Sequence, residues 1–199
     1  MLSTQTICKT CGVEYKASYL FPLLVILILI AAIIGGSWWY FKQQELEKEN
    51  IRKANVASYV EILKKIDIPE NEANMIATLK FSDISSLDKK DFSTLRAQVL
   101  AFEDQLKLSN SVMRVALAQP ISELQKIKRE VDKEKYIGCL EASRLLYSSS
   151  MDSSIEGMLT FLSEGKEKHD QITYLFTRSI VQGKEAKKLI NECESRISN

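Results

Sequence analysis

Glycine and proline are scarce in this chain, which has seven glycines and three prolines among its 199 residues. No glycine occurs between Gly36 and Gly138. Tight β-hairpins usually need glycine at positions of positive φ, so this long stretch argues against a hairpin-rich sheet. We therefore predict an all-α chain in which Pro69 and Pro120 mark helix starts or a kink.

Histidine is nearly absent as well, because His169 is the only one. Di-iron helical bundles need paired Glu-x-x-His motifs, which a single histidine cannot supply. The sequence also has no G-x-S-x-G, P-loop, H-E-x-x-H or EF-hand motif. His169 falls on an apolar stripe, so we interpret it as an interior or boundary residue. We predict that the chain is not an enzyme and has no catalytic residues.

Charge is absent between Lys16 and Lys42, a run of 25 residues. At about 1.5 Å per helical residue, such a run can cross the hydrocarbon core of a bilayer, which is about 30 Å thick. We predict a transmembrane helix at residues 19–41, in contact with membrane lipid. Residues 1–18 then form a short tail, and residues 42–199 form one helical, coiled-coil-like soluble domain.

Amphipathic aromatic rings, which settle at the headgroup level, mark both ends of this run: Tyr15, Tyr19, Trp38, Trp39 and Tyr40. A cleaved signal peptide is the alternative, because Gly35, Gly36 and Ser37 form a small-residue site. We favour the uncleaved anchor, since both the run and the segment before it are long for a signal peptide.

The orientation of the span rests on two opposing signals. Basic residues are more numerous after the span, which favours a cytoplasmic domain, but they belong to a mixed-charge helix, and long domains translocate largely regardless of charge. A reducing compartment suits the closely spaced thiols of Cys8 and Cys11. We therefore favour a bacterial inner-membrane protein with a cytoplasmic N-terminus and an exported C-terminal domain.

Two overlapping pairs of small residues lie within the span, at a spacing that lets two helix backbones approach closely. They are Ala31 with Gly35 and Ala32 with Gly36. This face predicts helix–helix contact and a homo-oligomer. Ordinary membrane-helix composition is the alternative explanation, because small residues are common in such helices.

The tail contains the motif Cys8-Lys9-Thr10-Cys11-Gly12. It resembles one knuckle of a zinc ribbon, in which two thiolates converge on one ion. A structural zinc site needs four ligands, so a second copy of the chain or another protein would supply the rest. Zinc shared between chains is therefore one interpretation, and an inert, reactive or acylated thiol pair is the other. The overall organisation resembles bacterial single-pass proteins with a zinc-ribbon head.

The segment after the span is formally neutral. The tail contains Lys9, Lys16 and Glu14, which leaves 25 basic and 25 acidic residues of the chain's 27 and 26 for the rest. Phosphate backbones require a net basic face, so we expect no nucleic-acid partner. Charges of alternating sign are typical of solvated helix faces.

Apolar periodicity predicts helices at Phe41–Asp67, which could continue the span, and around Ala73–Leu79. Asp91 is a plausible N-cap for a further helix with the spacing of a coiled-coil seam. Its apolar positions are Phe92, Leu95, Val99, Phe102, Leu106 and Met113. The pattern resumes after Pro120 and reaches Tyr147, so residues 91–149 are either one kinked helix or two.

A serine-rich turn at Ser148–Asp152 is the next predicted feature, followed by a capping box at Ser153–Glu156. The last helix would then run to about Ile197, with Gly165 and Gly183 as kinks or points of close packing. The predicted architecture is an elongated antiparallel bundle or a helical hairpin.

Cys139 and Cys193 lie within this domain, where an exported location would permit a disulfide. In a hairpin that turns near Ser150, however, Cys139 lies opposite Ser163, far from Cys193. Pairing therefore requires the last helix to fold back near Gly165. We favour two buried free thiols, since cysteine packs well as a small hydrophobe.

These features favour a single-pass, membrane-anchored scaffold or accessory subunit that acts by protein–protein interaction within a membrane complex. The alternative is a sensor or regulator whose exported bundle signals through the span to the cysteine-containing tail.

Overall fold

The computed structural model describes residues 6–7, 14–15, 20–82 and 89–198, and it divides into two compact units, Met1–Ile51 and Arg52–Asn199. Helices account for nearly all of the described chain, so the predicted all-α class is confirmed. In the first unit, two very short strands, β1 (Thr6–Ile7) and β2 (Glu14–Tyr15), pair in antiparallel register.

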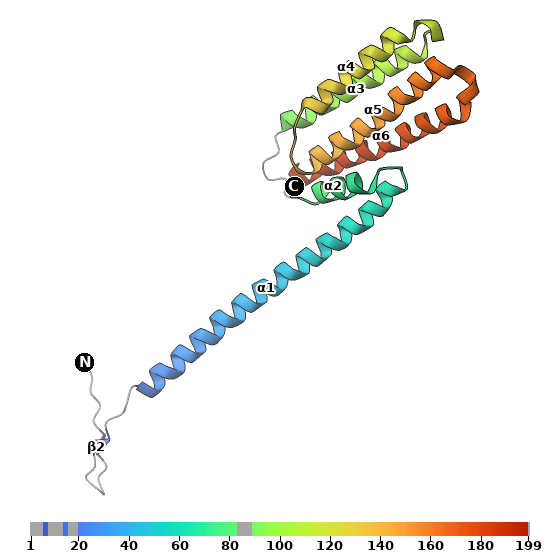
Figure 1. Cartoon of the computed structure of the whole chain (residues 1–199). Coiled ribbons are helices and arrows are strands. Elements are labelled where there is room, and N and C mark those ends of the chain that lie inside the picture. Colours follow the sequence, from blue (N-terminus) through green and yellow to red (C-terminus); the bar gives the residue numbers. More distant parts are fainter. Residues whose placement is uncertain (1–5, 8–13, 16–19, 83–88, 199) are drawn as a thin grey trace. The chain divides into compact units, whose positions relative to one another are not determined.

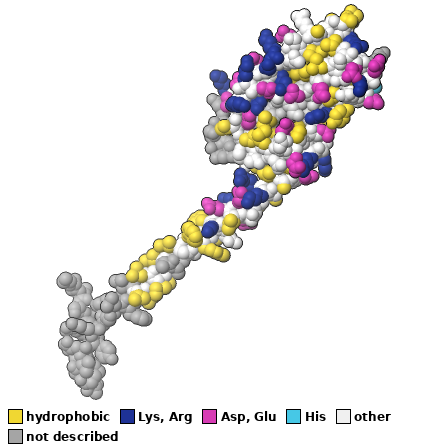
Figure 2. All heavy atoms as spheres, in the orientation of Figure 1, with side chains coloured by type: hydrophobic (Ala, Val, Ile, Leu, Met, Phe, Trp, Pro, Cys, Tyr) yellow, Lys and Arg dark blue, Asp and Glu magenta, His cyan; other side chains and the backbone are white. Residues whose placement is uncertain are grey.

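Helix α1 (Leu20–Lys64) is continuous over 45 residues. Among the described residues it is the one helix long and apolar enough to cross a membrane. A core helix of similar composition would bury its apolar side chains, whereas those of residues 24–30 are 42–59 % exposed. Figure 2 shows these hydrophobic side chains along the helix. The helix thus contains a candidate membrane span.

The second unit contains the end of α1 and five further helices. They are α2 (Glu70–Lys80), α3 (Lys89–Asn110), α4 (Ala118–Lys133), α5 (Gly138–Glu164) and α6 (His169–Ser198). Two short 3-10 turns, η1 (Arg114–Ala116) and η2 (Gly165–Lys168), precede α4 and α6. Helices α3 and α4 form one hairpin and α5 and α6 form another (Figure 1). This is the predicted helical bundle.

The predicted seam of α3 faces the hydrophobic core. Phe92, Leu95, Val99 and Phe102 are at most 7 % exposed, as expected for apolar side chains spaced three and four residues apart. Met113 does not continue the seam, because α3 ends at Asn110 and Met113 is 77 % exposed. The seam therefore ends one turn earlier than the sequence pattern predicts.

Residues 91–149 form neither one kinked helix nor two, because they contain most of α3, all of α4 and the start of α5. Pro120 lies in the first turn of α4, where a missing N–H leaves no hydrogen bond unmade. The break between α4 and α5 ends at Gly138, whose φ of 55° is open to glycine at little cost.

The predicted turn at Ser148–Asp152 is wrong, and so is the capping box at Ser153–Glu156, because both lie inside α5. The single last helix is wrong as well. The chain reverses at Gly165, where φ is 63°, and continues as α6. The serine-rich segment packs against α6 instead of turning.

Hydroxyl groups of this segment bond to α6. Ser150 Oγ donates to the carbonyl of Ser179 at 2.8 Å, and Ser154 Oγ lies 2.6 Å from Ser179 Oγ. Ser153 Oγ donates to the side-chain carbonyl of Gln182 at 3.2 Å. A Cβ added at Gly183 would lie 3.1 Å from Ser150 Oγ, so small residues bring the two helices close together.

Candidate interaction surface

Only some of the predicted site residues of the tail and the span lie within the described part of the chain. Cys8 and Cys11 lie outside the described residues, as do the side chains of Ala31 and Ala32. Gly35 and Gly36 lie within α1, and a Cβ added to either would meet no atom within 4 Å. The glycine side of this face is therefore open, as contact with a second helix requires.

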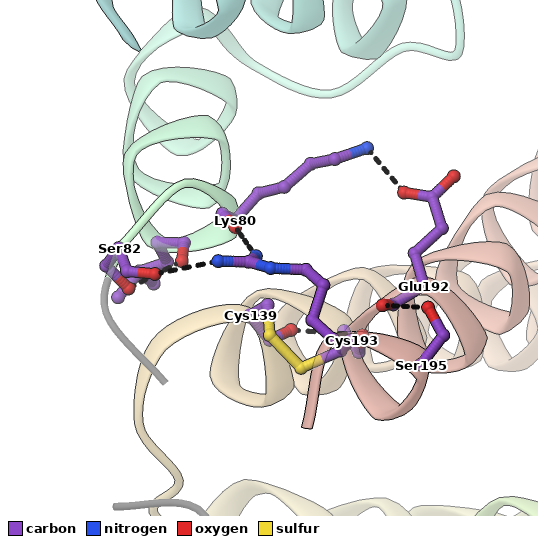
Figure 3. Close-up of a disulfide and its surroundings, with 9 residues drawn as sticks. Lys80, Ser82, Cys139, Glu192, Cys193 and Ser195 are labelled. Atoms are coloured by element: carbon purple, nitrogen blue, oxygen red, sulfur yellow. Dashed lines mark hydrogen bonds and ion pairs between the residues drawn. A yellow bond between two sulfur atoms is a disulfide. The ribbon is translucent and has the colours of Figure 1, made fainter. Parts of the chain in front are cut away.

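Cys139 and Cys193 are joined by a disulfide between the start of α5 and the end of α6 (Figure 3). Both residues are fully buried, and their Cα atoms lie 5.8 Å apart. The structure therefore contains a disulfide where we favoured two free thiols. That interpretation assumed a hairpin turning near Ser150, whereas the turn at Gly165 places the two cysteines side by side.

Beside the disulfide, charged side chains fasten α2 to α6. Lys80 pairs with Glu192 at 3.0 Å, as Figure 3 shows. The guanidinium of Arg196 donates to the carbonyls of Lys80 and Ser82 at the C-terminal end of α2, at 2.8 and 3.3 Å. These bonds satisfy carbonyls that a helix end leaves without intrahelical partners.

Tyr59 connects the end of α1 to the same region. Its hydroxyl donates to Glu185 Oε1 at 2.9 Å, and the ammonium of Lys80 lies 3.8 Å from the centre of its ring. Burial raises the pKa of Tyr59 above its ordinary value, and the charge of Glu185 raises it further. The phenol therefore stays a neutral hydrogen-bond donor that holds this part of α1 against α6.

A polar network joins α4 to α5. Arg144, only 4 % exposed, bonds Glu141 at 2.7 Å and lies 3.5 Å from Asp132. Asp132 also accepts hydrogen bonds from Ser148 and Lys128. Burial opposes ionisation of Asp132, but the bonds from Lys128 and Ser148 outweigh it and lower the pKa. This arrangement favours the charged forms, which suits a structural network better than acid–base catalysis.

His169 is exposed, which corrects its predicted interior or boundary position. It lies at a cavity of about 300 Å³ between the α3 and α5–α6 ends, lined mainly by apolar side chains such as Met158, Phe161 and Phe176. Within the part of the chain that the structure describes, no group of three histidine, cysteine or acidic residues could hold a metal ion.

The loop between α3 and α4 presents two apolar side chains to solvent. Met113 is 77 % exposed and Val115 is 87 % exposed. Between them, Arg114 donates to the carbonyl of Leu162 at 2.9 and 3.1 Å and to that of Ser163 at 3.0 Å. The guanidinium thus caps the end of α5 and holds the loop in place. The three-and-four spacing of α3 predicts Met113 in a buried seam, so the sequence pattern does not reveal this surface.

Comparisons with known proteins do not assign the chain to a family. No protein-family model, no curated protein and no solved structure matches it.

Proposed function

We propose that this protein is a single-pass, membrane-anchored helical scaffold or accessory subunit of a membrane-associated complex, acting by protein–protein interaction. The observation that carries this proposal is the loop at Met113 and Val115. Arg114 donates hydrogen bonds to carbonyls at the end of α5, which holds the loop in place. The side chains of Met113 and Val115 in this rigid loop face water. Rigid, exposed apolar groups are typical of contact surfaces, because little entropy is lost when a partner covers them.

The partner of this loop is proposed to be another subunit of the membrane complex. Figure 2 shows acidic and basic side chains interspersed over the visible face of the second unit, which supports a protein partner over nucleic acid. Membrane lipid is the proposed environment of the apolar part of α1.

The experiment compares the double variant Met113→Ser, Val115→Ser with Met75→Ser, a matched control on α2. Met75 is 46 % exposed and is not part of the loop. Native electrophoresis of membranes extracted in mild detergent should show the wild type and Met75→Ser in an assembly with other subunits. The loop variant should leave that assembly while retaining its helical content. A wild-type chain free of any other subunit contradicts the proposal.

The proposed orientation places the bundle outside the cytoplasm. A buried disulfide suits an oxidising compartment, whereas the thiols of Cys8 and Cys11 suit a reducing one. In intact cells, an impermeant thiol reagent should label a Lys133→Cys variant, because Lys133 is exposed at the end of α4 and lies outside the proposed contact loop, and should leave Cys8 and Cys11 unlabelled. Ready labelling of the tail contradicts this orientation.

A sensor or regulator is the second candidate function. It is favoured by the continuity of α1, whose last turns are bonded into the bundle through Tyr59 and Glu185. A shift of these turns would be passed to the cysteine-containing tail. Tyr59→Phe should then change the rate at which Cys8 and Cys11 react with thiol reagents in inside-out vesicles. Equal rates in the variant and the wild type contradict this function.

A further inference from the structure

A groove runs between α3 and α6, with α5 as its floor. Two adjoining hollows of about 300 and 230 Å³ lie along it, and both are lined by Val99, Glu103, Tyr147 and Lys187. The side chains of Tyr147 and Met151 line the floor and are 7 % and 2 % exposed. The groove is therefore a continuous concave surface and not a set of isolated dimples.

Each wall of the groove carries a stripe of side chains at helical spacing. The α3 wall is formed by Arg96, Val99, Leu100, Glu103 and Leu106, and the α6 wall by Ile180, Gly183, Lys184, Lys187 and Ile190. Ten residues of helix extend about 15 Å, so the groove is nearly three turns long. On each wall an apolar residue projects into solvent: Leu100 is 56 % exposed and Ile180 is 57 % exposed.

The two walls differ in charge. Glu103 lies on the α3 wall, and Lys184 and Lys187 lie on the α6 wall. Arg96, on the α3 wall, is already bonded to Glu194 at 2.7 Å and to Asn191 at 3.0 Å. Within residues 20–82 and 89–198, no ion pair engages Glu103, Lys184 or Lys187. The groove thus combines projecting apolar groups, hollows and charges of both signs, one sign on each wall.

We propose that a second copy of this chain covers the groove in a two-fold symmetric dimer. In such an interface the same surface serves both copies, so every contact occurs twice. Helices α3 and α6 run antiparallel along the groove, since Arg96 bonds near the end of α6 and Leu106 lies level with Ile180. A two-fold axis that runs along the groove, parallel to both helices, places the α3 wall of each copy against the α6 wall of the other.

Two contacts make the surface complementary to itself. Glu103 of each copy meets Lys184 and Lys187 of the other, so charges that form no ion pair within the described part of one copy gain one in the dimer. Leu100 and Ile180 enter the hollows of the opposite copy, which removes two large apolar side chains per chain from water. This inference rests on the proposed scaffold function and deepens it by naming one partner and its surface.

An amphipathic helix of another protein is the competing occupant. It would have to be acidic along one edge and basic along the other, whereas a second copy satisfies both requirements with residues already on the surface. The charges therefore favour self-association, and exchanging them between copies separates the two occupants.

The experiment exchanges the charges between copies of the full chain in detergent. One copy carries Glu103→Lys, and the other carries Lys184→Glu with Lys187→Glu. Both also carry Gly35→Leu and Gly36→Leu, which remove close contact through the span. Each variant alone places like charges opposite each other twice, so its dimer should be weaker by about tenfold or more. The mixture restores every pair, so copies with different tags should associate as tightly as the unexchanged chain.

The matched control for charge is Lys126→Glu on α4, which lies outside the groove and should leave the dimer unchanged. For the apolar contact, Ile180→Asp should abolish the dimer, and Val181→Asp, at 40 % exposure on the same helix but outside the groove, should retain it. Circular dichroism checks that each variant is folded.

Three results would overturn the proposal. They are a monomeric parent chain, dimers of equal strength in all charge variants, and failure of the mixture to associate. Native electrophoresis reports the scaffold function separately, because an assembly with other subunits that persists in the Ile180→Asp variant leaves that function standing while self-association fails.

Discussion

Cys139 and Cys193 are 54 residues apart in the sequence, yet their Cα atoms lie 5.8 Å apart across the start of α5 and the end of α6. The disulfide closes a loop that contains most of the α5–α6 hairpin and the turn at Gly165. Nearby, Lys80 and Glu192 connect α2 to α6. The bond therefore secures the open end of the hairpin, opposite the turn.

Replacing both cysteines, Cys139→Ala and Cys193→Ala, should lower the free energy of unfolding by roughly 4 kcal/mol, the chain-entropy estimate for a loop of this length. Urea denaturation followed by circular dichroism measures the change. Cys8→Ser with Cys11→Ser is the control and should leave the unfolding of the bundle unchanged. A loss below about 1 kcal/mol for the double alanine variant would show that the disulfide contributes little.

Arg144→Met should destabilise the bundle by about 3 kcal/mol, because it leaves Glu141 without its buried partner. Lys133→Met, which removes an exposed pair with Glu130, should cost at most about 1 kcal/mol. Chemical denaturation of both variants tests the contrast, and equal losses would contradict it.

We also expect this network to make the stability of the bundle depend on pH in the acidic range. Burial opposes the charged form of Glu141, but the hydrogen bonds from Arg144 and from the Tyr136 amide, together with the charge of Arg144, outweigh it and lower the pKa. The pKa of Asp132 is lowered in the same way by Lys128 and Ser148. A lowered pKa contributes stability above the unfolded value, about 4, and that stability is lost as the pH falls through the folded value. At pH values below about 4, the denaturation midpoint of the wild type should therefore decrease more steeply with falling pH than that of Arg144→Met.

We expect ionisation of Tyr147 at alkaline pH to lower the stability of the folded bundle. Burial, together with the charge of Glu103, raises the pKa of Tyr147 to about 12. The unfolded phenol titrates near 10, so the stabilisation is complete below about pH 10 and is lost as the pH rises toward 12. Tyr147→Phe should reduce the loss between these values, as measured by denaturation midpoints. An unchanged alkaline slope would exclude this contribution.

Gly165→Ala should cost about 1–3 kcal/mol, because the residue has φ of 63° and an added Cβ would collide with the Arg114 guanidinium. The collision should also release the loop at Met113 and Val115. Glu167→Ala is the control, because Glu167 is exposed in the same 3-10 turn. Thermal unfolding should separate the two variants, and equal transitions would contradict the prediction.

Zinc shared between two tails predicts one metal ion for every two chains, held by Cys8 and Cys11 of each copy. Metal analysis of the protein purified without chelators should find zinc in the wild type and none in Cys8→Ser, Cys11→Ser. Equal content in the two proteins would remove the metal site.

Local patterns were enough for the apolar helix, the all-α class and the seam of α3. The uncharged residues 17–41 predict a helix of membrane length, and the three-and-four spacing from Phe92 to Phe102 predicts a buried face. These features depend on the transfer free energy and helical period of neighbouring residues, which the order of amino acids contains directly.

Long-range contacts decided where the chain turns. Serines are typical of turns, but those at 149–154 stay helical because Ser179 and Gln182 of α6 satisfy their hydroxyls. The turn lies instead at Gly165, where Arg114 contributes from a distant loop. The pairing of Cys139 with Cys193 and the groove between α3 and α6 both follow from that turn. They depend on which helices meet, and that is determined by packing between residues far apart in the sequence.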